Sequence, residues 1–333
     1  SADTYRLFME RALGFLPPHG SASFIVPASF LADREAGALR HHLLERGLVA
    51  SVDLYPERTR LFAGVSQEVV ILTLFGGGKE EIGVFHQGKA LGTLPLADVV
   101  GVSPRSPLPF LNRKGLALYR HLAKAPRLGD LPGIAIRRGE IDRNKDRSLV
   151  GRGEGKLLRG RHVRRFRLTG EDRGDLEGFL ARRKGSARGA HVFTWRIAGR
   201  QVANRSAKER LAFALIEPPT LLGNSLNYIL FTRPPRPPFD LFLLLGLVNS
   251  SLLNWFFHVT NSNNHVGLYE LEALPLPAEA APEVLERIRT LAVEATSGGW
   301  NPERQAELDG LVRKAFGLTP EDLEGVSPAV EAR

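Results

Sequence analysis

Three short segments near the start of the chain, 21–30, 49–55 and 66–75, are almost continuously apolar and rich in Val, Ile and Leu. Segments 3–16 and 32–48 precede the first two of them and repeat their apolar residues with the period of an α-helix. Strands that are apolar along their whole length are typical of a sheet that helices cover on both faces. We therefore predict an α/β fold that opens with a partial doubly wound, Rossmann-like sheet.

Changes in composition indicate where the domains meet. A Gly-Gly-Gly run at 76–78 ends the alternating pattern and predicts a turn or hinge, because neither the Lys-Ser/Thr pair of a phosphate-binding loop nor a helical pattern follows it. The stretch 151–200 holds fourteen Lys or Arg against five Asp or Glu, whereas 278–333 holds six bases against eleven acids. The predicted organisation is an α/β domain over 1–78, a linker over 79–104, a mixed α+β domain over 105–277 and an acidic helical tail over 278–333.

Charge and cysteine content narrow the class of partner. Lys and Arg total 45 and Asp and Glu total 36, so the net charge is +9 and the isoelectric point is near 10.1, which favours nucleic acid or an acidic membrane surface. The absence of cysteine excludes disulfides and Cys-ligated zinc or iron–sulfur sites. No other group of residues has the spacing of metal ligands, so we expect no metal. A chain without cysteine fits a reducing cytoplasm, which is the location we expect.

The longest apolar run, 240–257, is interrupted by Asp, Asn and Ser and falls short of the roughly 20 apolar residues that cross a bilayer. We therefore predict a buried helix there and no membrane partner. The chain begins with Ser1 rather than Met and has no basic-then-apolar leader, so we expect a processed or excised piece of a protein.

The basic segment 153–168 mixes cations with a few apolar residues. The cations are Lys156, Arg159, Arg161, Arg164, Arg165 and Arg167, and the apolar residues are Leu157, Leu158, Val163 and Phe166. We expect the apolar side chains to anchor the segment while the guanidinium groups point outward, where they can bind phosphates or guanine edges. A solvated surface usually mixes charge signs and this segment barely does, so nucleic-acid contact is the favoured interpretation.

Several stretches resemble one family of enzymes. The TaqI-like, N6-adenine-specific DNA methyltransferases of restriction–modification systems have a catalytic domain whose second half is similar to DTYRLFMERALGFLPPHGSASFIVPASFL at 3–31 and RTRLFAGVSQEVVILTLF at 58–75. Their target-recognition domain resembles GEGKLLRGRHVRRF at 153–166 and the stretches 196–231 and 241–277. The resemblance implies a DNA-specificity domain attached to part of a catalytic domain.

The end of the recognition domain is the most specific part of the resemblance. In that family a helix with an Asn-Ser step, here Asn249-Ser250, and a polar loop lead to a Leu-Pro-Leu-Pro element, here 274–277, which closes the domain.

Two motifs of the family are absent from this sequence. The methyltransferases bind S-adenosylmethionine with an acidic, glycine-rich turn and catalyse with Asn/Asp-Pro-Pro-Tyr/Phe, whereas the Pro-Pro pairs here follow Leu, Glu, Arg and Arg. We therefore expect no catalytic residue in this chain and no methylation by it alone. S-adenosylmethionine would be the cofactor of the complete enzyme.

The resemblance also implies roles for single side chains. Phe8 corresponds to an aromatic residue that packs against the adenine ring of the cofactor, and Phe62 to one that holds the target adenine after it has rotated out of the duplex. A plain core role is the alternative for each. Arg reads guanine, and Asn or Gln reads adenine. The candidate base-reading residues are Arg161, Arg164, Arg196, Arg200, Gln201, Asn204 and Asn224.

The first hypothesis is therefore the DNA-binding and specificity portion of an S-adenosylmethionine-dependent, adenine-N6 DNA methyltransferase. The alternative is a non-enzymatic specificity or adaptor subunit that serves a separate catalytic chain, and a general RNA- or membrane-binding protein is a third reading. Because the first strands of the sheet would be missing, the strand at 21–26 should have an unpaired edge. We expect double-stranded DNA as ligand, and the missing N-terminal catalytic half or a second copy of the chain as protein partner.

Overall fold

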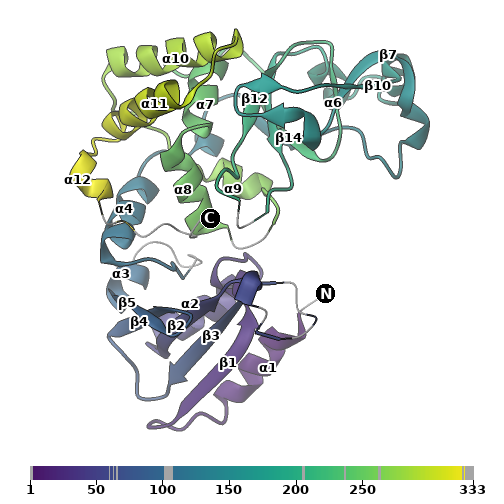
Figure 1. Cartoon of the computed structure of the whole chain (residues 1–333). Helices are drawn as coiled ribbons and strands as arrows, with labels where there is room; N and C mark the ends of the chain where they lie inside the picture. The colour runs from purple at the N-terminus through teal and green to yellow at the C-terminus, as the bar shows by residue number, and fades with distance from the viewer. Residues whose placement is uncertain are drawn as a thin grey trace. The chain divides into compact units, whose positions relative to one another are not determined.

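Two compact units make up the computed structural model of the chain (Figure 1). Residues up to Ala123 form most of unit 1, and Lys124–Phe257 and Asn264–Thr319 form most of unit 2. Unit 2 thus begins later than the predicted boundary at 105. The structure describes residues 3–59, 61, 62, 64, 67–100, 108–204, 207–235, 238–261, 264–324 and 326.

A five-stranded sheet with the order β1-β3-β2-β4-β5 is the core of unit 1. β3 is antiparallel to β1 and β2, which therefore run in the same direction, and β2 pairs in parallel with β4. The mixed α/β class is confirmed, while the doubly wound sheet stays a prediction because β2–β4 is the one parallel pair of this described sheet. The strands are β1 (Ser21–Pro27), β2 (Val49–Tyr55), β3 (Val69–Phe75), β4 (Glu81–His86) and β5 (Lys89–Pro95), and the helices are α1 (Thr4–Leu13), α2 (Gly37–Glu45), α3 (Leu96–Val100), α4 (Arg113–Ala123) and α12 (Pro320–Leu323).

The prediction of a linker over 79–104 is wrong. The described part of that stretch contains β4, β5 and α3, and residues 101–104 lie outside the described part. The β4–β5 turn, Gln87-Gly88, has positive φ angles of 51° and 77°, as two-residue hairpin turns require. The backbone N–H of Gly88 donates to a carboxylate oxygen of Asp53 (3.1 Å), which ties the turn to β2.

β1 lies at the edge of the sheet and is more exposed than predicted (Figure 1). Ile25 is 52% exposed, so burial on both faces is wrong for this strand. Leu7, Phe8 and Phe15, in and just after α1, are also exposed. Within the described part of the chain, β3 is the sole strand paired with β1. An edge strand beside exposed apolar side chains is a surface on which another polypeptide can pair.

Unit 2 contains two sheets and a short hairpin. The order of the antiparallel sheet is β12-β11-β14-β6, and the order of the smaller sheet is β10-β7-β13. β8 and β9 form the hairpin. The strands are β6 (Ile134–Arg138), β7 (Val150–Leu158), β8 (Val163–Arg164), β9 (Arg167–Leu168), β10 (Asp172–Gly174), β11 (Arg196–Arg200), β12 (Phe213–Ile216), β13 (Leu221–Leu222) and β14 (Leu226–Phe231), and the short helices are α5 (Leu176–Arg182), α6 (Ala187–His191) and α9 (Leu268–Glu272).

The Leu-Pro-Leu-Pro element pairs with the segment that enters unit 2. The backbone N–H of Leu128 donates to the carbonyl of Leu274 (2.8 Å), and that of Leu276 donates to the carbonyl of Pro126 (2.8 Å). Leu274 and Leu276 are buried. The alternating prolines suit an extended segment of this kind, because proline favours extended backbone and has no N–H that would need a partner.

The predicted helix over 240–257 is two helices. α7 (Leu241–Val248) and α8 (Ser251–Thr260) are bent by 66° at Asn249-Ser250. Leu243 to Val248 are all buried, in agreement with a core helix. In the described part of the chain no single helix is long and apolar enough to cross a membrane, although this bent pair reaches the required length and composition when its two helices are taken together.

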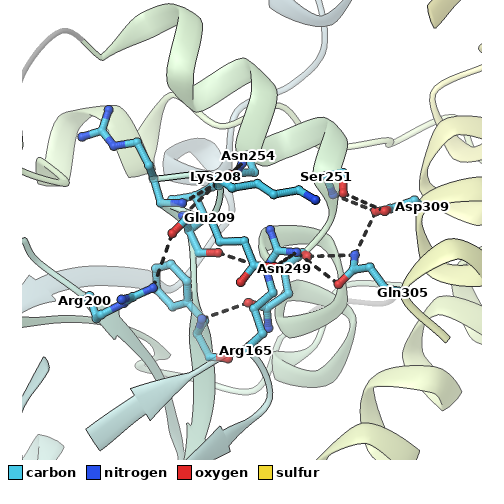
Figure 2. Close-up of polar contacts among 12 residues, drawn as sticks. Arg165, Arg200, Lys208, Glu209, Asn249, Ser251, Asn254, Gln305 and Asp309 are labelled. Carbon is cyan, nitrogen blue, oxygen red and sulfur yellow. Dashed lines mark hydrogen bonds and ion pairs between the residues drawn. The ribbon is translucent and has the colours of Figure 1, made fainter. Parts of the chain in front are cut away.

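Two side-chain amides, Asn249 at the helix break and Asn254 in α8, bind backbone groups of β12 and of the residues just before it (Figure 2). Asn249 Oδ1 accepts from the backbone N–H of Phe213 (2.9 Å), and its Nδ2 donates to the carbonyl of the same residue (3.0 Å). Asn254 Oδ1 accepts from the N–H groups of Arg210 (2.9 Å) and Leu211 (3.0 Å). Buried backbone groups need partners, and here two asparagines supply them.

The predicted acidic tail over 278–333 is not a separate segment in its described part. α10 (Pro282–Thr296) packs on α7, and α11 (Pro302–Ala315) packs on α10. The Asp309 carboxylate on α11 accepts from both the backbone N–H and the hydroxyl of Ser251 (2.7 Å each), where α8 begins (Figure 2). A carboxylate at a helix N-terminus satisfies free N–H groups and complements the helix dipole.

An ion pair is buried in the core of unit 2. Arg196 Nη1 on β11 lies 2.8 Å from Glu140 Oε1, and both side chains are fully buried. Arg196 also donates to the carbonyl of Thr220, and its guanidinium lies 4.8 Å from the ring centre of Tyr228. The Tyr228 hydroxyl is 2.9 Å from His191 Nδ1. Burial raises the pKa of Glu140 against the pull of Arg196, and burial raises the pKa of Tyr228 to about 12.

Asn249→Leu should destabilise unit 2 by about 2–4 kcal/mol, because buried N–H and C=O groups of Phe213 would lose a partner. Asn301→Ala is the matched control, since it removes only the N-cap bond of α11, worth about 1 kcal/mol. Urea unfolding followed by tryptophan fluorescence reports on this unit, because Trp195, Trp255 and Trp300 all belong to it. Equal losses for the two variants would contradict the amide pairing.

Tyr228→Phe should make unit 2 less sensitive to alkali. The folded-state pKa of about 12 lies above the ordinary 10.0, so the contribution of Tyr228 to stability is complete below that ordinary value and is lost as the pH rises through the folded-state pKa. At about 1.4 kcal/mol per pKa unit, the unmodified chain should lose about 2–3 kcal/mol more than the variant between about pH 9 and about pH 12. Urea unfolding at both pH values measures the difference. Equal losses of unfolding free energy in the unmodified chain and the variant would contradict the prediction.

Candidate nucleic-acid interface

The β8–β9 hairpin carries the centre of the basic segment, and its turn is buried. The turn residues are Arg165 and Phe166, and Phe166 has a φ of +62°. This backbone conformation costs a bulky residue about 1–3 kcal/mol. Packing offsets the cost, because Phe166 is buried with its ring centre 4.1 Å from that of Trp300. The turn is therefore the anchor of the hairpin, and this fixes which residues face solvent.

Arg165 belongs to this anchor, so its predicted contact with DNA is wrong. Its Nη1 donates to Gln305 Oε1 (3.1 Å) and pairs with Glu209 Oε1 (3.2 Å), and its Nε donates to the carbonyl of Leu211 (3.3 Å) (Figure 2). Burial lowers its pKa although Glu209 acts in the opposite direction. The side chain is only 8% exposed and cannot reach a ligand.

Three arginines, which we call the hairpin arginines, face solvent: Arg164 and Arg167 on the two strands, and Arg161 in the 3-10 turn Gly160–His162 just before β8. Arg164 Nη1 donates to the carbonyls of Arg161 (3.0 Å) and Val163 (2.9 Å), which fixes its guanidinium against the hairpin. The predicted apolar anchors are all buried, as expected: Leu157, Leu158, Val163 and Phe166. The hairpin thus presents cations on a rigid support.

Acidic residues next to β7 partly neutralise the segment. Asp172 accepts from Arg159 and from Arg161 (2.6 Å), and Glu171 pairs with Lys156 (2.9 Å). Partial burial acts to raise the pKa of Asp172, but the hydrogen bonds and charges of Arg159 and Arg161 outweigh it and lower that pKa. Arg161 is nevertheless 63% exposed, so it can exchange Asp172 for a phosphate.

Arg200 adds a further positive charge near the hairpin. Burial and the charge of Arg164 both lower the pKa of Arg200, while Glu209 acts in the opposite direction. Arg200 Nη2 donates to the carbonyl of Glu209 at 3.4 Å. Like charges held close together repel unless an anion lies between them.

Two predicted base-reading residues have internal partners instead. Arg196 is fully buried against Glu140, so its predicted contact with a base is wrong. Gln201 is 9% exposed, and its Nε2 lies 2.9 Å from His265 Nδ1, so its amide is not directed to a ligand. A buried charge needs a partner within the protein, and Glu140 is that partner for Arg196, the first residue of β11.

The two remaining predicted asparagines lie at the surface. Asn204 is exposed, and Asn224 is half-buried. The backbone N–H of Asn224 donates to the carbonyl of Ile141 (2.7 Å), and its own carbonyl accepts from Arg138 Nε (2.7 Å). The side chain of Asn224 also hydrogen-bonds to Asp142. Contact of either asparagine with a base stays a prediction.

The structure also brings out cations that were not predicted. The stretch 178–208 contains no Asp or Glu. Among the residues of this stretch that the structure describes, the exposed cations are Arg182, Arg183, Lys184, Arg188 and Lys208. Arg182 pairs with Asp146 (3.7 Å) outside the stretch. A long run without carboxylates is the sequence signal that could have pointed to this surface.

Phe8 and Phe62 are both at the surface of unit 1. Phe8 is 74% exposed on α1, and Phe62 is 42% exposed next to positions 60 and 63, which lie outside the described part. A core role is therefore wrong for either ring, and each is open to a ligand. Among the described residues no three His, Asp or Glu side chains gather as a metal site requires.

No family model and no curated protein matches this sequence. The type IIL restriction–modification enzyme MmeI, solved in complex with DNA, matches with a TM-score of 0.61 and 12% identity over 96% of this chain and 50% of that chain. The type IIG restriction endonuclease BpuSI has a TM-score of 0.37 and 12% identity over 95% of this chain and 49% of that chain. The HsdS subunit from Thermoanaerobacter tengcongensis has a TM-score of 0.30 and 15% identity over 61% of this chain and 50% of that chain.

The folds of BpuSI and of the HsdS subunit are only weakly similar to that of this chain. The match to MmeI shows that this chain has a fold similar to part of a restriction–modification enzyme and spans about half the length of that enzyme.

Proposed function

We propose that this chain is the DNA-binding and specificity portion of an adenine-N6 DNA methyltransferase of a restriction–modification system. Unit 2 would be the target-recognition domain, and unit 1 the C-terminal part of a Rossmann-like catalytic domain. The hairpin carries the proposal, because its turn is buried while Arg161, Arg164 and Arg167 face solvent. The fold similarity to a restriction–modification enzyme supports it.

The hairpin suits duplex DNA for physical reasons. A two-stranded ribbon fits the major groove, and planar guanidinium groups can bind guanine edges or phosphates with two hydrogen bonds each. Because Arg165 and Phe166 already hold the hairpin, little backbone ordering remains to oppose binding. Lys156 and Arg159, which have acidic partners, would add to the positive field more than to base readout.

The methyl-transfer step would require the rest of the enzyme. When bound, S-adenosylmethionine would supply the methyl group for the N6 amino group of an adenine rotated out of the duplex. This chain would contribute Phe8 against the adenine of the cofactor and Phe62 against the target adenine, since an exposed ring offers a flat apolar face to each. The cofactor turn and the Asn/Asp-Pro-Pro-Tyr/Phe motif are absent from the sequence, so the chain alone would not methylate.

The edge of β1 is where the missing catalytic strands would join. A strand added there would pair the open edge and cover Ile25, and it would extend the sheet toward the doubly wound form. A non-enzymatic specificity subunit is the second candidate, favoured by the missing motifs. It would use the same hairpin on double-stranded DNA in the cytoplasm.

Changing the three hairpin arginines to alanine should reduce the salt dependence of DNA binding. Each phosphate contact adds about 0.9 to the slope of log affinity against log salt concentration, so the slope should become shallower by up to about 3. Fluorescence anisotropy of a labelled duplex over a range of salt concentrations measures this slope.

A triple alanine variant of Arg287, Arg304 and Lys314 is the matched control, because it removes the same charge from α10 and α11. Its slope should stay close to that of the unmodified chain. An unaltered slope in the hairpin variant, or affinity of the unmodified chain that ignores salt, would refute DNA binding through the hairpin. Equal affinity for RNA and duplex DNA would favour a general basic binding protein.

Co-expression with a polypeptide that carries the missing cofactor turn and Pro-Pro motif should restore methylation of duplex DNA. Ile25→Lys should weaken the association, because it places a charge beside the open edge of β1. Leu91→Lys on β5, at the other edge of the sheet, is the control. Co-purification and transfer of a labelled methyl group are the measurements. Stable association without methylation would favour the adaptor, and no association at all would contradict both readings.

A further inference from the structure

Two aromatic side chains of unit 2 are exposed between buried neighbours. Phe193 is 54% exposed and Trp195 is 46% exposed, whereas Val192 and Arg196 on either side of them are fully buried. Aromatic rings contribute most of their binding energy when they are covered, so two exposed rings within one short segment are typical of a binding surface. Neither ring belongs to the hairpin site described above.

The backbone that carries these rings is fixed by hydrogen bonds. The N–H of Phe193 donates to the carbonyl of Ala190 (3.1 Å), and that of Thr194 donates to the carbonyl of His191 (3.2 Å), which continues the last turn of α6. His191 is in turn held by the hydroxyl of Tyr228 (2.9 Å). Because the segment is tied to the core at this point, a small loop movement would not bury the rings.

The charges around this segment are positive. It lies within the carboxylate-free stretch 178–208. Arg137 on β6 is the register partner of Tyr228, whose hydroxyl contacts His191, and Arg188 lies on α6, the helix that leads into the aromatic segment. Arg137 and Arg188 are exposed. Flat apolar faces among cations match a partner with flat apolar groups and negative charge, which is the chemistry of a nucleic acid.

Building on the function proposed above, we propose that Phe193 and Trp195 stack on DNA bases that have left the helical stack, while Arg188 and Arg137 bind neighbouring phosphates. Every base has a flat face, so such a platform tolerates any sequence and would complement the base readout of the hairpin. Moving an unpaired base out of the helical stack costs less free energy than moving a paired base, so the two rings should favour duplexes that contain an unpaired base.

The test uses the full chain and a fluorescein-labelled duplex with a single-nucleotide bulge, followed by anisotropy. Phe193→Ala and Trp195→Ala should each weaken binding about 5- to 140-fold, the range expected for one base–aromatic stack, and should leave the salt slope unchanged. Trp195→Phe keeps a flat ring and should restore most of the affinity. The preference for the bulged over the fully paired duplex should fall in the two alanine variants.

Phe15→Ala is the matched control, because Phe15 is an exposed ring beside Arg11 (5.3 Å) in unit 1, and it should not alter affinity. The bulged duplex should quench part of the tryptophan emission of the unmodified chain, and this quenching should be absent in Trp195→Phe, which keeps Trp255 and Trp300 in place. Stacking would be refuted if Trp195→Ala bound the bulged duplex tightly or had a changed salt slope, or if the duplex left the emission of Trp195 unquenched. These outcomes would leave the hairpin proposal intact, because the salt slope of the hairpin variant tests it separately. A lack of salt-dependent binding by the unmodified chain would instead refute the hairpin proposal.

Discussion

The amides of Asn249 and Asn254 satisfy backbone groups of β12 and of the residues just before it, and this pairing ties the helix break to the sheet and the hairpin of unit 2. An edge strand exposes N–H and C=O groups that need partners, and a helix break supplies them here in place of another strand. Gln305 donates to the carbonyl of Asn249 (3.4 Å), so α11 is tied to the same break. The carbonyl of Phe213 also accepts from the N–H of Phe166 (2.8 Å). The buried amide thereby sets the position of the hairpin and of the arginines on it.

Arginine has two separate uses in unit 2, and burial distinguishes them. Arg165 and Arg196 are surrounded by acceptors or aromatic faces within the protein, as a guanidinium group must be when it leaves water. The hairpin arginines lie on the outside of the same framework. Net charge alone does not separate the two groups, because a buried arginine and an exposed one count equally in it. The available positive surface is therefore smaller than the composition suggests, and it is more sharply localised.

The sequence predicts elements where one pattern dominates and fails where tertiary contacts decide. β2 was predicted to the residue, because Val49–Tyr55 is apolar and bounded by a helix end. β4 and β5 were missed because glycine and charged residues interrupt the alternation of apolar and polar residues in them.

The break at Asn249 was missed because apolar residues flank it on both sides. The need for an amide there arises from its hydrogen bonds to Phe213 on β12, which the sequence does not reveal. Arg165 was misassigned because a hairpin turn with Phe166 in a left-handed conformation lacks the glycine that usually marks one. The aromatic pair went unnoticed because exposure is not visible in a sequence.

The two units expose different kinds of surface, and this bears on the choice between readings. In the part of the chain that the structure describes, unit 1 has an open edge along β1, which carries the exposed Ile25, and it also exposes Phe8 and Phe15. Such a surface suits another polypeptide. Unit 2 exposes cations on a rigid hairpin, and such a surface suits a polyanion. A general basic binding protein would need the cationic surface of unit 2 but not the open edge of β1 in unit 1. A specificity module that works with a catalytic partner would need both surfaces. The open β1 edge is therefore as informative about function as the arginines are.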